Sequence, residues 1–262
     1  MSQNSTIEWT DATWNPVTGC TKVSPGCKFC YAEVFAERFR GVPGHPYEQG
    51  FELRLWPERL ELPLKWKPRR IFVNSMSDLF HERVPDEYIS KVFDVMIQAD
   101  HHIFQVLTKR SERMVEWTRK RFRVVNEKKN DKPTLPSHIW LGVSVENQDY
   151  VHRISDLQRV PTRVRFLSVE PLLGPVSLTQ KLLRGIHWVI VGGESGPGAR
   201  PMKPEWALDI QRQCGKYEVP FFFKQWGAFN RDGKRVGKKK AGRRLNGKTW
   251  NDMPVILSSS IA

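Results

Sequence analysis

The chain has 262 residues, of which 39% are hydrophobic, so it can bury the core of one large domain or of one domain with an extension. No run approaches the roughly 18–20 apolar residues that span a bilayer, and no apolar signal segment opens the sequence. We therefore expect a cytoplasmic protein without a membrane partner. The net charge of +14 favours anionic partners.

The first expected element is a short strand just before a loop with three cysteines, Cys20-Thr-Lys-Val-Ser-Pro-Gly-Cys27-Lys-Phe-Cys30. Three thiolates this close can converge on one metal centre, whereas structural zinc sites and shielded iron–sulfur clusters use four protein ligands. A cubane held by three cysteines leaves one iron open to a substrate or cofactor. The alternatives are a zinc site completed by Cys214 or a histidine, and disulfides, which are unexpected without a signal segment.

From residue 71 onward, apolar runs alternate with stretches of helical spacing. The runs are rich in β-branched and aromatic residues and predict strands at 71–73, 102–107, 139–145, 164–169, 187–191 and 219–223. Helical spacing predicts helices over 86–99, 111–122 and 205–214, with Pro85 before the first and Ser111 as N-cap of the second. The buried face of the first helix should carry Tyr88, Val92, Val95, Met96 and Ala99.

Alternation with roughly 25–35 residues per unit predicts βαβ units and a parallel sheet that is covered on both faces. No Gly-x-Gly-x-x-Gly fingerprint of an open Rossmann sheet follows an early strand. We therefore predict an α/β fold, a partial TIM-like (β/α) barrel of six or seven mostly parallel strands over residues 1–226. Residues 41–68, rich in proline, should form an irregular insertion, and 227–262 a basic C-terminal extension packed on the barrel.

Polar side chains follow almost every predicted strand, where the working residues of α/β barrels lie. In chain order these residues, with a glycine pair before the last glutamate, are Asn74, Ser75, Ser77, Asp78, Thr108, Lys109, Ser144, Glu146, Asn147, Ser168, Glu170, Gly192, Gly193, Glu194, Ser195, Lys224 and Gln225. A single serine or asparagine could merely cap a helix. Glutamates that recur after three strands indicate a site instead.

Two segments, 109–132 with net charge +6 and 231–244 with net charge +7, carry almost all of the excess charge. Clustered cations attract phosphate backbones through direct contact and counterion release. We expect nucleic-acid contacts from Lys109, Arg110, Lys238, Lys239, Lys240, Arg243 and Arg244. The alternatives are a solvated helix face with a basic loop, or a protein partner.

The pair Cys27-Lys-Phe-Cys30, with a further cysteine upstream, resembles the cluster loop of the radical S-adenosylmethionine (radical SAM) enzymes, although the first gap here is six residues and most of that superfamily has three. The whole chain more closely resembles a phage-associated family of uncharacterised three-Cys-motif proteins. The matching segments are Trp9-Thr-Asp-Ala-Thr-Trp-Asn-Pro16, Asn74-Ser-Met-Ser-Asp78, Ser168-Val-Glu-Pro171, Gly192-Gly-Glu-Ser195 and Lys224-Gln-Trp-Gly227.

The radical SAM resemblance implies that Cys20, Cys27 and Cys30 hold a [4Fe–4S] cluster whose open iron binds the amino and carboxylate groups of S-adenosylmethionine. Cleavage of that cofactor would give a 5′-deoxyadenosyl radical that abstracts hydrogen from a substrate. The resemblance also implies an electron donor such as flavodoxin or ferredoxin.

Binding roles follow from the same resemblance. Phe29 would pack on the adenine, and Ser75, Ser77 and Asp78 would bind the methionine amino group. Ser144 and Glu146 would contact the ribose, and Ser168 and Glu170 would complete the cofactor site. Gly192 and Gly193 would let the backbone approach a ligand, and Glu194 would face substrate or adenine.

The pair Lys109-Arg110 starts a basic segment at the expected barrel mouth, so a phosphate-bearing substrate would lie beside the radical. This placement resembles a base-modifying or lesion-repairing enzyme, such as a relative of spore photoproduct lyase. Nucleic acid or a nucleotide is therefore the expected substrate. The alternatives are a zinc-stabilised nucleic-acid-binding protein without catalysis, and a radical SAM enzyme that acts on a protein or small molecule.

Overall fold

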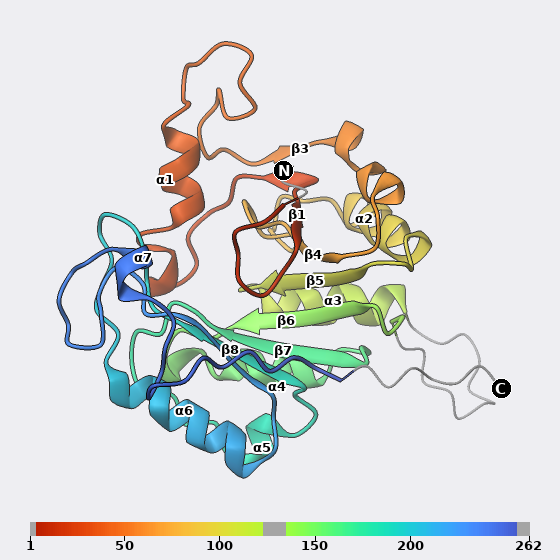
Figure 1. The fold of residues 1–262 in the computed structure, drawn as a ribbon. Helices are drawn as coiled ribbons and strands as arrows, with labels where there is room; N and C mark the ends of the chain where they lie inside the picture. Colours follow the sequence, from red (N-terminus) through yellow and green to blue (C-terminus); the bar gives the residue numbers. More distant parts are fainter. Residues whose placement is uncertain (1–3, 123–134, 256–262) are drawn as a thin grey trace, which may run out of the picture.

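The computed structural model describes residues 4–122 and 135–255, and its centre is a curved parallel sheet of seven strands (Figure 1). In spatial order the strands are β1 (Ala12–Trp14), β4 (Arg70–Val73), β5 (Ile103–Thr108), β6 (Ile139–Ser144), β7 (Val164–Val169), β8 (Trp188–Gly192) and β9 (Phe221–Gln225). Every neighbouring pair is parallel. The predicted α/β partial barrel is therefore confirmed.

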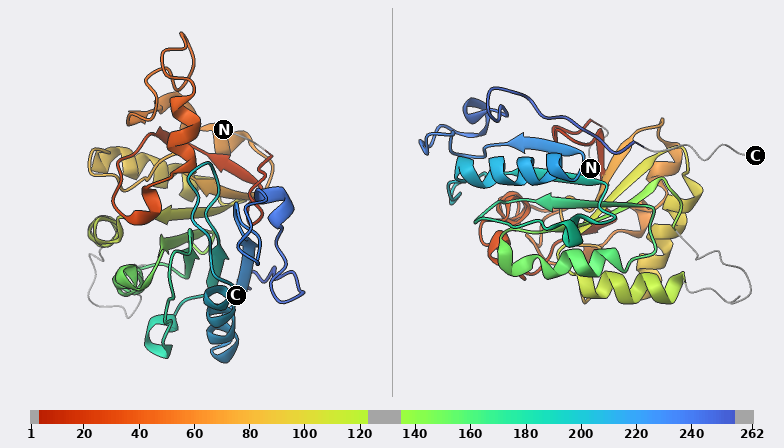
Figure 2. Two further views of the ribbon diagram at one scale, coloured as in Figure 1. Left: turned by 90° about the vertical axis from the view of Figure 1, so that its left-hand side faces the viewer. Right: turned by 90° about the horizontal axis from the view of Figure 1, so that it is seen from below.

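Helices cover the outer side of the curved sheet (Figure 2). They are α2 (Asp86–Gln98), α3 (Ser111–Arg121), α4 (His152–Gln158), α5 (Gln180–Leu183) and α6 (Pro204–Lys216), while α1 (Tyr31–Glu37) and α7 (Lys238–Ala241) lie near the end at which the strands finish. The predicted buried face of α2 is confirmed. The N-cap prediction was wrong, because Arg110 holds that position and the Ser111 hydroxyl instead donates to Asp156 Oδ2 at 2.6 Å.

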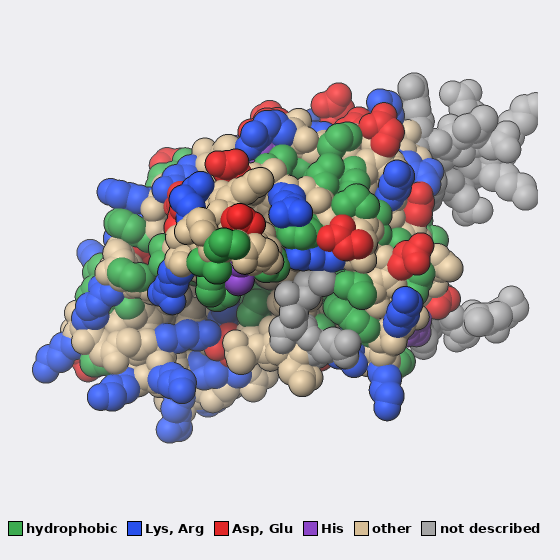
Figure 3. Space-filling model, turned by 90° about the horizontal axis from the view of Figure 1, so that it is seen from above, with side chains coloured by type: hydrophobic (Ala, Val, Ile, Leu, Met, Phe, Trp, Pro, Cys, Tyr) green, Lys and Arg blue, Asp and Glu red, His purple; other side chains and the backbone are tan. Residues whose placement is uncertain are grey.

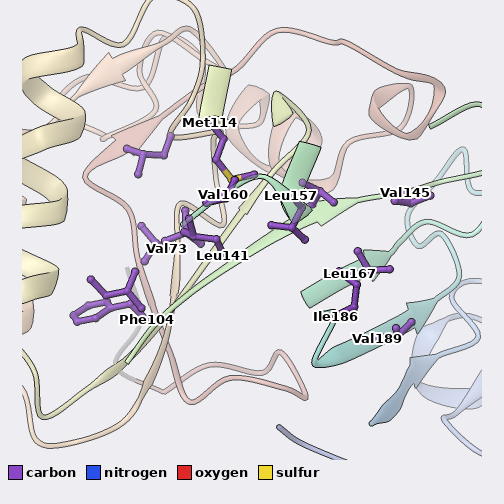
Figure 4. Close-up of a cluster of buried hydrophobic side chains, with 14 of the residues drawn as sticks. Val73, Phe104, Met114, Leu141, Val145, Leu157, Val160, Leu167, Ile186 and Val189 are labelled. Atoms are coloured by element: carbon purple, nitrogen blue, oxygen red, sulfur yellow. The ribbon is translucent and has the colours of Figure 1, made fainter. Parts of the chain in front are cut away.

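The pleat of the strands sorts apolar side chains into two cores. Alternate residues such as Val73, Leu141 and Leu167 face the helices and form the larger outer core (Figure 4). The residues between them form an inner cluster on the concave side: Trp9, Phe72, Trp140, Val164, Phe166, Trp188, Ile190 and Phe222. Gly142 is needed here, because a Cβ at that position would lie 2.6 Å from the ring of Phe166. The inner cluster closes the interior below the strand ends.

The 41–68 insertion is mostly irregular, with one short strand and two 3₁₀ turns. Strand β3 (Arg54–Leu55) pairs antiparallel with β2 (Val17–Thr18), and η2 (Pro57–Arg59) and η3 (Leu62–Lys65) follow. Trp56 is buried between the guanidinium groups of Arg54 and Arg59 and donates to Thr18 Oγ1 at 2.8 Å. This contact ties the insertion to the segment that precedes the cysteine loop.

The C-terminal segment runs along the last strand. Asn251 forms an antiparallel bridge with Phe222, and the Trp188 indole donates to the Asp252 carbonyl at 2.7 Å. Lys238 Nζ lies 3.1 Å from Glu8 Oε1, which links this segment to the N-terminal one. Residues 227–255 thus contact the sheet edge and the start of the chain.

The first basic segment begins at the strand ends with Lys109 and Arg110, and its described part then runs away from them along α3. Helix α3 runs back from the strand ends, so Arg119, Lys120 and Arg121 in its last turn lie far from them (Figure 1). The predicted basic residues Arg123, Lys128, Lys129 and Lys132 fall outside the described residues. Helix α7 and its basic neighbours lie at the end that carries the strand termini, where Lys and Arg side chains gather at the left of Figure 3. None of the described helices is long and apolar enough to cross a membrane.

Candidate active site at the open end of the barrel

Two adjoining cavities open where the parallel strands end. The inner cavity, about 200 Å³, is lined from the sheet by Trp9, Phe72, Leu107, Ser144, Ser168, Glu170, Lys224 and Gln225, and from loops by Phe29, Gly193, Glu194 and Ser195. The cysteine cavity, about 140 Å³, is lined by Cys20, Cys27, Cys30, Ser75, Ser77, Asp78, Lys109 and Arg110. Cys27, Cys30 and Tyr31 line both. Most of the predicted site residues therefore meet around one connected space.

The three loop cysteines are unpaired and half-buried, and they lie beside cations. Burial raises the pKa of Cys20 to about 11, and Asp78 adds to this rise while Arg110 opposes it. Burial also raises the pKa of Cys30. Arg110 Nη1 lies 3.3 Å from Cys20 Sγ. The raised pKa of Cys20 and Cys30 favours their protonated form, so metal binding there would release protons and leave a thiolate on Cys20 that Arg110 can stabilise.

The donor set fits an iron–sulfur cluster better than a single zinc ion. Within residues 4–122 and 135–255, no three His, Cys, Asp or Glu side chains converge tightly enough to hold one ion. A tetrahedral zinc with Zn–S bonds of about 2.3 Å would bring thiolates within roughly 3.8 Å of one another. A cubane binds each thiolate to a different iron and needs a wider spread. Cys20, Cys27 and Cys30 line one cavity, so their donor chemistry and shared location are compatible with such a cluster.

Cys214 cannot complete this set. It lies on the buried face of α6 in the outer core, and it lines neither cavity. Burial raises its pKa to about 12, as expected for a small apolar core residue. The fourth cysteine is therefore structural, and a cluster bound by the other three would keep one iron open.

Glu146 supports the cysteine loop from behind. Its side chain is 0% exposed, accepts a hydrogen bond from Ser24 Oγ at 2.5 Å, and forms ion pairs with Arg153 at 3.0 Å and Lys109 at 3.2 Å. Gly26 must be glycine because a Cβ there would lie 2.5 Å from Glu146 Cγ. Glu146 lines neither cavity, so the structure does not place it where the predicted ribose contact would need it.

Arg200 holds the opposite wall. It binds both carboxylate oxygens of Glu194, at 2.6 and 2.8 Å, donates to the Pro25 carbonyl at 2.9 Å and lies 5.3 Å from the Phe29 ring. Gly198 also packs against this ring, since a Cβ there would lie 2.3 Å from it. Phe29 is thus fixed at the edge of the inner cavity, as adenine packing would require.

The predicted glycine pair serves internal packing. A Cβ on Gly193 would lie 2.0 Å from the Trp226 carbonyl oxygen, and one on Gly192 would lie 2.4 Å from Glu170 Oε1. Only Gly193 reaches the inner cavity. The sequence predicted that these glycines let the backbone approach a ligand. In this structure it is other protein atoms that lie close to them.

Asp78 is the centre of a buried hydrogen-bond network. Its carboxylate accepts from Thr108 Oγ1 at 2.7 Å and from the Lys109 backbone at 3.0 Å, and it pairs with Arg110 at 3.2 Å. Ser77 donates to the Val17 carbonyl at 2.8 Å. The Arg110 side chain is only 9% exposed and also pairs with Glu82, so its setting suits the cysteine cavity rather than a phosphate backbone outside it.

The floor of the inner cavity carries polar atoms that lack partners. Among the described residues, Trp9 Nε1 and Gln225 Oε1 are buried without a hydrogen bond, beside the Glu170–Lys224 ion pair of 3.1 Å. An unpaired buried donor or acceptor costs about 1–3 kcal/mol. Both atoms are enclosed by protein, so a ligand in the cavity could pair with them only after side chains shift. The sequence placed Gln225 at a strand end, but no local signal identified Trp9 or Arg200.

The basic C-terminal residues have different settings. Lys239 and Lys240 are exposed, and they form no ion pair with any residue that the structure describes. Arg243 is half-buried over the Phe222 ring at 4.9 Å and donates to Asn251, and Arg244 donates to the Gly247 carbonyl at 2.8 Å. The two lysines therefore suit phosphate contact better than the two arginines.

These features define an α/β half-barrel protein with a cysteine-lined cavity at the carboxyl ends of its strands. Residues 4–254 match the family described as "Protein of unknown function (DUF5131)", and the chain belongs to this family. The family description mentions no phage, so that association stays a prediction. No curated protein matches the sequence.

Similar solved structures include three of spore photoproduct lyase. A cysteine-to-serine mutant is 11% identical with a TM-score of 0.45, over 81% of this chain and 75% of that one. A tyrosine-to-phenylalanine mutant is 10% identical with a TM-score of 0.45, over 80% and 75%. A double mutant with bound AdoMet and dinucleoside spore photoproduct is 12% identical with a TM-score of 0.36, over 80% and 54%.

Proposed function

We propose that this protein is a radical SAM enzyme that acts on nucleic acid or a nucleotide, with a [4Fe–4S] cluster on Cys20, Cys27 and Cys30. The observation that carries the proposal is the placement of the thiols. All three line one cavity that adjoins a second, larger one, and the fourth cysteine lies in the outer core. This arrangement suits a cluster with an open iron that faces a cofactor and a substrate.

The residues of the chain have separate roles in this proposal. Arg110 offsets the negative charge of the thiolates, and Glu146 keeps the loop in place through Ser24. When bound, a reduced cluster supplies the electron that cleaves S-adenosylmethionine, and a flavodoxin or ferredoxin would be its donor. Phe29 would pack on the adenine, and the fixed walls around it would exclude water.

The remaining predicted contacts are part of the same proposal. Ser75, Ser77 and Asp78 line the cysteine cavity, where the methionine amino group would bind. Ser144, Ser168, Glu170 and Glu194 line the inner cavity, where ribose and substrate would lie. Trp9 and Gln225 line the same cavity and would contact the substrate there.

Nucleic acid is the proposed substrate class because exposed cations surround this end of the molecule. Lys239 and Lys240 belong to α7, which lies at the end where the strands finish. Lys109 lines both cavities and would place a positive charge beside a bound phosphate. Salt-dependent binding is the expected consequence of such contacts.

The test is metal analysis of protein purified without oxygen. We expect about four irons and four acid-labile sulfides per chain and a visible band that bleaches on reduction. The Cys27→Ser variant should lose the iron, and the matched control Cys214→Ser should keep it. S-adenosylmethionine cleavage with dithionite as reductant should then follow the iron content.

The outcomes separate three functions. Stoichiometric zinc without iron would refute the radical mechanism and assign a zinc-stabilised nucleic-acid-binding protein. A full cluster that cleaves S-adenosylmethionine, in a protein that binds no nucleic acid at low salt, would assign a protein or small-molecule substrate instead.

A further inference from the structure

A third hollow adjoins the inner cavity at the surface of α1. It has a volume of about 360 Å³ and is lined by Phe29, Tyr31, Val34, Phe35, Arg38, Met76 and residues 195–197. We call it the α1 groove. It shares Phe29, Tyr31 and Ser195 with the inner cavity, so the two spaces adjoin at these residues. A ligand that fills the inner cavity can therefore continue directly into the groove.

The groove displays aromatic faces that a soluble protein normally buries. Tyr31 is 52% exposed and Phe35 is 43% exposed, and they lie one helical turn apart on α1. The Tyr31 hydroxyl donates to the Ser75 carbonyl at 2.5 Å, which fixes that ring beside the cysteine cavity. Exposed, positioned aromatic rings are the feature that single-stranded nucleic-acid-binding proteins use to stack bases.

Phe35 is held in position from behind. Its ring contacts Phe39 at 5.2 Å and Tyr47 edge-on at 5.7 Å, and Phe39 in turn stacks on His45 at 3.9 Å. The arm that carries Phe39, His45 and Tyr47, residues 38–50, is closed by a hydrogen bond from the Gly41 backbone N–H to the Glu48 carbonyl at 2.7 Å. The platform is thus preorganised, which lowers the entropy cost of stacking a base on it.

The charge around the groove selects an anionic occupant. Arg38 is the charged residue that lines it, and the described part of the chain contains no recorded ion pair for this side chain. Arg235 of the basic C-terminal segment donates to the carbonyls of Gly196 and Pro197, each at 2.7 Å, and so joins that segment to the groove rim. The nearby carboxylates of Glu33 and Glu37 are neutralised by Lys22 and Arg40.

We propose that the α1 groove binds the base next to the nucleotide held in the inner cavity, so that the ligand is an unpaired strand of nucleic acid. A base that stacks on the exposed Phe35 ring must leave the stack of its own strand, so it cannot remain in a regular duplex. The neighbouring base would stack on Phe35, and its phosphate would meet Arg38. This inference rests on the nucleic-acid part of the proposed function, but not on the cluster chemistry.

The test measures fluorescence anisotropy of labelled oligonucleotides of about 12 nucleotides, as DNA and as RNA, single-stranded and as duplexes, with the full chain as isolated without oxygen. The wild type should bind single strands more tightly than duplexes. Phe35→Ala should weaken single-strand binding by about 5- to 100-fold, the effect of losing one base–aromatic stack. Phe35→Leu should also weaken it, because leucine is apolar but has no π face.

Two further variants keep the test sharp. Val42→Ala is the matched control, since Val42 is 43% exposed on the same arm and does not line the groove; its affinity should stay within about twofold of wild type. Arg38→Gln should weaken binding and reduce the salt slope by about 1, because one phosphate contact is lost.

Several results would overturn the inference. Wild-type affinity in Phe35→Leu would show an apolar contact without stacking, and unchanged binding in Phe35→Ala would exclude the groove from the strand path. A wild-type dimer that Phe35→Ala converts to monomer, without loss of oligonucleotide affinity, would assign the groove to a second copy of the chain. Iron and sulfide are counted in the same samples. If the wild type contains no iron but binds oligonucleotides as expected, the cluster proposal is refuted and the groove inference still holds.

Discussion

Replacing Glu146 by glutamine tests how the cysteine loop is held. The carboxylate is buried 3.2 Å from Lys109 Nζ and 3.0 Å from Arg153 Nη1, and at an effective dielectric constant of about 20 each pair attracts by roughly 5 kcal/mol before desolvation. Breaking a buried ion pair costs about 3–5 kcal/mol. Glutamine keeps an acceptor for Ser24, and Lys109, which is 19% exposed, can turn toward water. We therefore expect Glu146→Gln to lower the free energy of unfolding by about 2–4 kcal/mol and the Tm by about 5–15 °C.

The pH dependence of this loss gives a second readout. Burial alone would raise the pKa of Glu146, but Lys109, Arg153 and Ser24 together hold it below its usual value of 4.5. A carboxyl whose pKa is lowered in the folded state contributes stability above its unfolded pKa and loses it as the pH falls toward the folded pKa. The difference in Tm between wild type and Glu146→Gln should therefore be largest at neutral pH and should decrease below about pH 4.5.

The assay is thermal unfolding at several pH values, with iron content measured on the same samples. Glu116→Gln is the matched control, because Glu116 is exposed in the middle of α3 and has no recorded ion pair in the described chain. It should leave the Tm within about 1–2 °C of wild type. The reasoning would be refuted if Glu146→Gln behaved like this control, or if its gap to wild type stayed constant as the pH fell.

Three further predictions concern the cavities and the basic segment. Gly198→Ala would bring a Cβ within 2.3 Å of the Phe29 ring, so the free energy of unfolding measured in urea should fall by about 1–3 kcal/mol. The control Gly215→Ala lies in α6, where the new Cβ would be 3.9 Å from its nearest neighbour, so it should be neutral or stabilising. Equal effects of the two substitutions would contradict this reasoning. Gln225→Leu removes a buried acceptor without a partner, so the Tm should stay equal or rise. The affinity for nucleotide, measured by calorimetry, should fall. A lower Tm would indicate that the amide has a structural role. Lys239→Gln with Lys240→Gln should weaken oligonucleotide binding and lower its salt slope by about 2, and an unchanged slope would exclude these lysines from phosphate contact.

Strand positions were predictable where both faces of the strand are apolar. Strand β7 is found at the predicted residues 164–169, because four of its six residues are buried apolar side chains that lie on both faces of the sheet. Strand β9 begins and ends two residues later than predicted, at Phe221–Gln225. Its last residues, Lys224 and Gln225, point their polar side chains into the inner cavity, so an apolar pattern ends too early there.

The charged residues were the hardest to place. Lys109 and Arg110 are two cations in a basic stretch, and by composition alone they resemble Arg119 and Lys120 of the same segment. In the structure they are largely buried and bind Glu146 and Asp78, whereas α3 carries the other two to the far end of the molecule. A sequence reports the sign of a charge but not the residues that lie opposite it after folding.

The sequence by itself determined the order of strands and helices and the cluster of three thiols in one loop, because periodicity and close spacing are local properties of the chain. Only the tertiary structure decided what those thiols face. Arg200 reaches the carbonyl of Pro25 across 175 residues of sequence, and Arg110 reaches Cys20 across 90. These contacts depend on the curvature of the sheet, which brings the ends of distant strands to one opening, and no local pattern encodes that distance.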